Sequence, residues 1–201
     1  MFNLNKKIIE NSYKQIIDSL GDVVDKKGVN DTPKRVANAY EELLSGYTAD
    51  IEKIINNALF HVEYDQIVIV KNIKFYSLCE HHILPFFGKI DIGYLPNNKI
   101  IGLSKIPRIT QVFSKRLQVQ ERLTEQIGKA IFENTDALGA GVVINAQHMC
   151  SSMRGVNMPG TDMVTSSLFG TFKSDDATRK EFFDLMILML STCSIFFNLL
   201  L

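Results

Sequence analysis

The chain of 201 residues has no tryptophan, only three cysteines and no net charge, because 22 basic residues balance 22 acidic ones. A balanced charge gives no sign of the basic surface that nucleic acid or an anionic membrane attracts, so we expect neither partner. Three cysteines, an odd number, do not make a disulfide framework and favour a reducing compartment. Residues 1–20 also lack the continuous apolar run of a signal peptide. We therefore expect a cytoplasmic protein.

Charged residues are missing from the C-terminal end, residues 185–201, which closes on an apolar run. This stretch is slightly short for a transmembrane helix, which needs roughly 20 apolar residues. Three interpretations stay open. The segment is buried against the domain or a partner subunit, or a change of reading frame has altered the terminus, or it is a membrane anchor. We favour the first and least expect the last.

The spacing of apolar residues predicts helices first and a mixed domain afterwards. A period of three to four residues predicts helices over 4–20 and from Thr32-Pro33 to Gly46. Later helices are predicted at 104–117, 121–134 and 174–184, and strands at 67–70, 73–78, 87–95, 141–150 and 163–172. Residues 100–101 are predicted to return on 87–95 as a hairpin.

Helices and antiparallel strands are mixed without a regular βαβ alternation, so the predicted fold class is α+β. We divide the chain into an N-terminal helical segment (1–60), a main domain (61–187) and an atypical apolar tail (188–201).

Two short clusters, CEHH at 79–82 and HMC at 148–150, contain most of the histidine and cysteine of the chain. Thiolate and imidazole ligands together indicate zinc. Cys79 and His82 are three residues apart and so face the same way on a helical turn. With Cys150 they form a Cys-His-Cys ligand set, which leaves a fourth zinc position open for chemistry.

The two remaining histidines of these clusters, His81 and His148, are candidates for acid–base catalysis. An open zinc site lowers the pKa of its bound water toward ~7. Both imidazoles would flank that water as proton donors and acceptors, in a suitable titration range. The strand period places His148 and Cys150 on one face, aimed at the same point. The alternatives are a closed structural site with His148 as fourth ligand, or histidines that only orient a ligand.

Five basic residues and no acidic one lie within residues 99–120. Lys105 and Arg108 fall in the first turn of the helix that Ser104 begins, where the macrodipole disfavours cations. A bound anion would explain them, because free N–H groups and two cations converge there. Arg154, four residues past the second cluster, would add positive charge near the metal. The alternative is a solvated basic face.

A carboxylate, Glu121, lies at the start of the next predicted helix. A carboxylate accepts two hydrogen bonds, and so it can pair with a donor–donor edge such as the N1–H and 2-amino group of guanine. The alternative is that Glu121 only caps its helix.

Taken together, these segments resemble the GTP cyclohydrolase I family over roughly residues 8 to 186. The matching stretches are Thr32-Pro33-Lys34-Arg35, Ser77-Leu78-Cys79-Glu80-His81-His82 with Pro85-Phe86, Gly102-Leu103-Ser104-Lys105, Gln118-Val119-Gln120-Glu121-Arg122-Leu123-Thr124, and His148-Met149-Cys150 with Met153-Arg154-Gly155. The resemblance implies a tunnelling-fold (T-fold) subunit in a homodecamer with active sites between subunits. It implies hydrolytic opening of the GTP imidazole ring at C8, loss of formate and rearrangement to 7,8-dihydroneopterin triphosphate.

The resemblance also implies a role for each matching residue. The Zn²⁺ ligands would be Cys79, His82 and Cys150. The proton-transfer groups would be His81 and His148, the latter at N7 of the purine. The guanine would be held by Gln120 and Glu121. The triphosphate would be held by Ser104, Lys105, Arg108, Arg154 and Arg35, the last from a neighbouring subunit.

Three features depart from the family pattern. Asn145 stands where the family usually has an acidic residue, Ser151-Ser152 replaces a more apolar pair, and the chain beyond about Met186 has no counterpart. The first two leave the chemistry intact, whereas an apolar tail on each of many subunits favours aggregation.

Two rival functions are a zinc-stabilised oligomer that only binds purine nucleotides, and a related T-fold enzyme such as the nitrile reductase of queuosine synthesis. Against the first, the chain keeps His81 and His148, which metal binding alone does not need. Against the second, neither that reductase's cysteine-nucleophile pattern nor the three-histidine zinc pattern of its fold-mates is seen.

Overall fold

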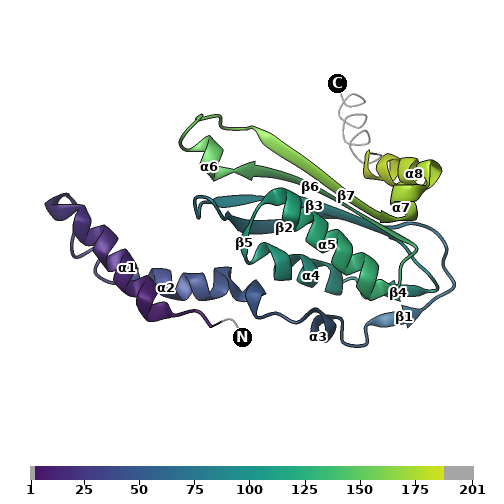
Figure 1. The fold of residues 1–201 in the computed structure, drawn as a ribbon, viewed down its shortest axis with the longest axis horizontal. Helices are drawn as coiled ribbons and strands as arrows, with labels where there is room; N and C mark the ends of the chain where they lie inside the picture. The colour runs from purple at the N-terminus through teal and green to yellow at the C-terminus, as the bar shows by residue number, and fades with distance from the viewer. Residues whose placement is uncertain (1–2, 188–201) are drawn as a thin grey trace, which may run out of the picture.

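The computed structural model describes residues 3–187, so the predicted apolar tail (188–201) lies outside the described residues. The helices and strands follow one another as in Figure 1. In chain order they are α1 (Lys6–Ser19), α2 (Thr32–Leu43), α3 (Ile51–Ile55), β1 (Leu59–His61), β2 (Val68–Cys79), β3 (Pro85–Leu95), β4 (Lys99–Ile101), α4 (Lys105–Ser114), β5 (Leu117–Gln118), α5 (Gln120–Thr135), β6 (Gly139–His148), α6 (Met149–Ser152), β7 (Asp162–Gly170), α7 (Thr171–Ser174) and α8 (Asp176–Ile187).

The main sheet has the strand order β5-β2-β3-β6-β7, and every pairing is antiparallel except that of β2 with β5. Helices α4 and α5 pack on one face of this sheet (Figure 1). Ile90 and Ile92 are two residues apart on β3 and so point to the same face. Both are fully buried in one core cluster with Ile127 of α5. Each such side chain contributes roughly 1.5–3 kcal/mol relative to an exposed one. The predicted α+β class, an antiparallel sheet with packed helices, is confirmed.

Helix α8 covers part of the opposite face of the sheet (Figure 1). Its Phe182 is fully buried and lies against Gly93 of β3 and Gly141 of β6. A Cβ atom at either glycine would come within 2.7 Å or 2.8 Å of the Phe182 ring. The two glycines therefore leave the space that the ring fills, and side chains there would force the helix away.

The predicted hairpin between 87–95 and 100–101 is wrong. β4 pairs instead with β1 in a separate two-stranded sheet, with Leu59 opposite Ile101. The reason is that β3 has no free edge, because β2 and β6 occupy its two sides as far as Tyr94. One link remains, since the Ile101 backbone N–H donates to the Tyr94 hydroxyl at 3.3 Å.

The C-terminal elements differ from their predicted bounds. The strand predicted over 163–172 ends at Gly170, whose φ of +57° turns the chain out of the sheet. The helix predicted over 174–184 is divided into α7 and α8 at Asp175, which is extended. The Asp175 carboxylate accepts from the Thr178 N–H at 2.7 Å, which explains why a new helix begins there.

The N-terminal helices α1 and α2 form an antiparallel pair that extends away from the sheet (Figure 1). The Tyr13 and Tyr40 hydroxyls share a hydrogen bond of 2.9 Å across this pair. The pair joins the domain near α4, where the Gly46 N–H donates to the Lys115 carbonyl at 3.0 Å. The division at residue 60 stays a prediction, and that residue falls within β1.

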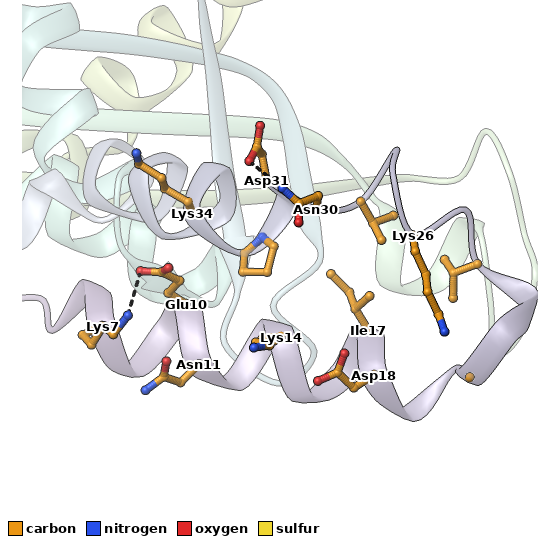
Figure 2. Close-up of a pocket in the computed structure, with 14 residues that line it drawn as sticks. Lys7, Glu10, Asn11, Lys14, Ile17, Asp18, Lys26, Asn30, Asp31 and Lys34 are labelled. Atoms are coloured by element: carbon orange, nitrogen blue, oxygen red, sulfur yellow. Dashed lines mark hydrogen bonds and ion pairs between the residues drawn. The ribbon is translucent and has the colours of Figure 1, made fainter.

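An open pocket of about 560 Å³ lies between α1, α2 and the loop that joins them (Figure 2). Figure 2 shows Lys14 and Asp18 of α1 on one side and Lys34 of α2 on the other. None of the predicted catalytic, metal-binding or substrate-binding residues lines this pocket. Among residues 3–187, no helix has both the length and the apolar character needed to cross a membrane.

Candidate metal centre and active site

Three predicted metal ligands meet at one end of the main sheet. Cys79 is the last residue of β2, His82 lies in the turn to β3, and Cys150 lies in α6 directly after β6. Since β3 pairs with both β2 and β6, the ends of these strands are neighbours. The ligand atoms of the three side chains all lie within 4.8 Å of one another.

The turn after β2 places two of these ligands. The Ile83 N–H donates to the Cys79 carbonyl at 2.8 Å, which closes one helical turn. Ile83 itself has a φ of +54°, an uncommon conformation for a β-branched residue, and the chain then reverses into β3. Cys79 and His82 thus face the same way, as their spacing predicts.

Cys150 is on a helical turn, not on the predicted strand over 141–150. The strand ends at His148, and the Met153 N–H donates to the Met149 carbonyl at 3.1 Å. Because the chain leaves the strand at this point, His148 and Cys150 do not alternate on one strand face, and that part of the prediction is wrong. Cys150 joins the metal-ligand group, whereas His148 does not belong to it among the described residues.

The chemistry of this group suits a soft divalent cation. Cys79 is buried, and burial together with the neighbouring Cys79 thiol raises the pKa of Cys150. Two thiols side by side resist ionisation, and a bound cation removes that penalty by holding both thiolates. Two sulfurs and one imidazole fit Zn²⁺, and within the described chain no fourth side chain closes the group.

The two remaining histidines are close to metal ligands in the chain, His81 next to His82 and His148 two residues before Cys150. His81 Nδ1 is 3.6 Å from Cys79 Sγ, and the His81 side chain is exposed. The half-buried His148 ring is stacked on Phe86, with 4.7 Å between centroids and 5° between planes. Burial lowers the pKa of His148, and the nearby charge of Glu121 partly opposes this. A neutral imidazole is therefore favoured at His148.

Gln120 is buried next to His148, and only 1% of its surface is exposed. Its Oε1 atom is 2.8 Å from His148 Nε2. The sequence predicts Gln120 only as a guanine contact and gives no sign of its pairing with His148. The side chain is in the first turn of α5, and no periodicity shows which strand residue lies opposite it.

Glu80 and Arg122 connect the metal turn to α5. Arg122 Nη1 and Nη2 donate to the two Glu80 oxygens at 2.7 Å and 2.9 Å. This bidentate pair lowers the pKa of Glu80. It therefore ties the turn that carries Cys79 and His82 to the helix that carries Glu121. The sequence contains both residues inside motifs, but it gave no signal that they pair.

The predicted anion-binding residues are spread over three places. Arg154 reaches the metal centre, where its Nη1 atom is 3.2 Å from His82 Nε2. Lys105 and Arg108 begin α4, and their side chains have no hydrogen-bond or ion-pair partner among residues 3–187. Ser104 precedes this helix without a side-chain capping bond. Arg35 lies on α2, is exposed and pairs with Asp31 at 3.8 Å.

Glu121 is exposed at the start of α5 and lines an open pocket of about 440 Å³. The rest of the lining comes from β7, from Glu125 and from Lys173. The carboxylate of Glu121 therefore faces any ligand in this pocket. The preceding residue, Gln120, contacts His148.

Comparison with known proteins confirms the resemblance. A protein-family model described as GTP cyclohydrolase I matches residues 9–187. GTP cyclohydrolase 1 of Campylobacter jejuni is 50% identical over 181 residues, 90% of this chain and 95% of that protein. GTP cyclohydrolase 1 of Leptospira biflexa is 52% identical over 178 residues, which cover 89% of this chain and 97% of that protein. A solved structure of the archaeosine synthase QueF-Like in its apo form has a TM-score of 0.45 and 11% identity, and the match covers 54% of this chain and 97% of that chain.

Proposed function

This chain belongs to the GTP cyclohydrolase I family, and on that premise we propose that it hydrolyses GTP to 7,8-dihydroneopterin triphosphate and formate, the first step of pterin and folate biosynthesis. The observation that carries the proposal is the group at the end of the sheet. Cys79, His82 and Cys150 come together there, with His81 against Cys79 and His148 at the end of β6, two residues before Cys150. Metal binding alone needs neither of these two histidines, whereas hydrolysis needs groups that move protons.

Cys79, His82 and Cys150 would hold Zn²⁺, which supplies Lewis acidity that activates water at neutral pH. Thiolate ligands require that both cysteines stay reduced, which supports a cytoplasmic location. Opening the imidazole ring at C8 requires a base for the incoming water and an acid for the leaving ring nitrogen. His81 and His148 would fill these roles, with His148 acting at N7 of the purine.

The substrate would extend from the metal centre in two directions. Glu121 would accept the N1–H and 2-amino donors of guanine. Arg154 would hold phosphate oxygens beside the metal, and Lys105 and Arg108 have unpaired side chains within residues 3–187. Ser104, and Arg35 of a neighbouring subunit, would complete the triphosphate contacts.

A homo-oligomer, the decamer of our sequence prediction, is supported by apolar surface on the N-terminal helix. Helix α1 buries no residue in the single chain. Its Ile8 and Ile16 side chains are 62% and 54% exposed. Apolar side chains gathered on one exposed helix favour burial against another subunit.

We expect light scattering to give the molar mass of an oligomer, and the double variant Ile8→Glu/Ile16→Glu to give a smaller one, because two buried charges disfavour the interface. The double variant Lys7→Gln/Lys14→Gln makes the same change in charge at exposed positions on the other side of α1 and should keep the wild-type mass. A monomeric wild type, or an unchanged mass in the isoleucine variant, would contradict this role of α1.

The direct test of the function is zinc-loaded protein with GTP, in which formate and the pterin chromophore should appear together. Within this assay, Glu121→Ala is expected to lower kcat/KM for GTP by roughly tenfold to a hundredfold, the effect of losing hydrogen bonds to a charged group. Turnover of ATP, which lacks the donor–donor edge, should not change. Glu125→Ala is the matched control, because Glu125 is exposed and lines the same pocket. Unchanged discrimination between GTP and ATP in Glu121→Ala would exclude the proposed contact.

A further inference from the structure

The side-chain amide of Gln120 can adopt only one orientation. Its Nε2 atom faces the backbone carbonyls of Ile144 and Met163 at 3.2 Å and 2.9 Å. Carbonyl oxygens only accept hydrogen bonds, so the atom that faces them must be the donating nitrogen. The oxygen of the amide therefore points at His148, 2.8 Å from its Nε2 atom.

Two threonine hydroxyls complete this network. Thr124 Oγ1 donates to the backbone carbonyl of Gln120 at 2.7 Å and is 2.6 Å from Thr165 Oγ1. Thr165 Oγ1 in turn lies 3.1 Å from Gln120 Nε2, so the two hydrogens of the amide are shared among three acceptors. With every atom of the amide engaged and its side chain buried, Gln120 is held rigidly between α5, β6 and β7.

This orientation decides where the proton of a neutral His148 lies. Gln120 Oε1 can only accept, so His148 Nε2 must carry the proton and donate it. The stacking of the ring on Phe86 then fixes its plane. Nδ1 is left as the acceptor, and it has no hydrogen-bond partner among residues 3–187.

We infer that Gln120 is a positioning residue that holds His148 in the Nε2–H tautomer, so that the proton His148 exchanges with the substrate moves at Nδ1. The inference rests on the proposed function, and it assigns Gln120 a role that the family resemblance did not imply. An amide is suited to this role because it accepts a hydrogen bond without adding a charge beside the imidazole. Glu121, the next residue, remains the side chain that faces the pocket.

The first test reads the tautomer in zinc-loaded wild-type protein by ¹⁵N solid-state NMR after labelling of the histidine rings. The chain has four histidines, and the difference from His148→Asn identifies the signals of His148. At mildly alkaline pH, where imidazole is neutral, we expect a protonated Nε2 and an unprotonated Nδ1. A protonated Nδ1 would overturn the inference. This result does not depend on turnover, so it stays informative even if the protein releases no formate from GTP.

The second test separates positioning from substrate binding. In Gln120→Met, of similar length, we expect a mixture of tautomers, a kcat for GTP lower by about 10- to 100-fold and an unchanged KM. Gln118→Met is the matched control, because Gln118 is equally buried but its amide bonds to Phe113 and Gln126 instead of His148. It should keep the wild-type tautomer and kcat.

Two kinetic outcomes would overturn the inference. A wild-type kcat in Gln120→Met is one. A raised KM with loss of discrimination between GTP and ATP is the other, since it would make Gln120 a guanine contact like Glu121. If Gln120→Met does not fold, the spectrum of the wild-type protein decides alone.

Discussion

Replacement of Cys150 by alanine is expected to remove bound zinc and GTP turnover together. Cys150 supplies one of two sulfurs in a group whose ligand atoms lie within 4.8 Å. Without it, one sulfur and one exposed imidazole remain, too few to retain zinc against dilution. Metal analysis after gel filtration should find less than one zinc per chain, and formate release should fall to the background rate.

The neighbouring variant Ser151→Ala controls for damage to α6. Ser151 is half-buried in the same short helix and is not part of the ligand group. It should keep both zinc and turnover. A Cys150→Ala protein that retains stoichiometric zinc would show that the ligand set is wrong, whereas zinc-loaded wild type without turnover would contradict the function and leave the ligand set intact.

The sequence predicts local features of this fold well. The helical spacing of apolar residues predicts α4 and α5, and the CxxH spacing predicts that Cys79 and His82 face the same way. Both depend on neighbours within one or two turns of the chain, which a sequence displays directly.

Features that depend on distant partners were not predictable in the same way. β4 looks like the second strand of a hairpin until β6 is known to occupy that edge of β3. Cys150 reads as a strand residue because nothing local marks the end of the β6 ladder. The Glu80–Arg122 pair and the contact of Gln120 with His148 join residues 42 and 28 positions apart. Only the packing of α5 on the sheet brings them together.

The strand end at His148 matters for the chemistry. If the strand had continued, His148 and Cys150 would point at one place, as the strand period of the sequence predicts. The helical turn instead sends Cys150 to the other ligands and leaves His148 between Phe86 and Gln120. A histidine held in this way is available for proton transfer beside the metal.

We accordingly expect His148→Ala to keep its zinc and to release formate about 10²- to 10⁴-fold more slowly, the usual contribution of a general acid–base group. The variant leaves Gln120 Oε1 buried without its partner, so a loss of about 1–3 kcal/mol in the free energy of unfolding is also expected. Zinc content, the thermal midpoint and the rate of formate release, measured on one preparation, separate these effects.

The chain provides its own control for this experiment in His61, an exposed histidine of β1 that is outside the metal group. His61→Ala should match the wild type in all three measurements. Loss of zinc in His148→Ala would instead indicate that His148 is a metal ligand and that the site is closed. Normal turnover with full zinc would remove His148 from the mechanism and leave His81 as the remaining imidazole beside Cys79 to move protons.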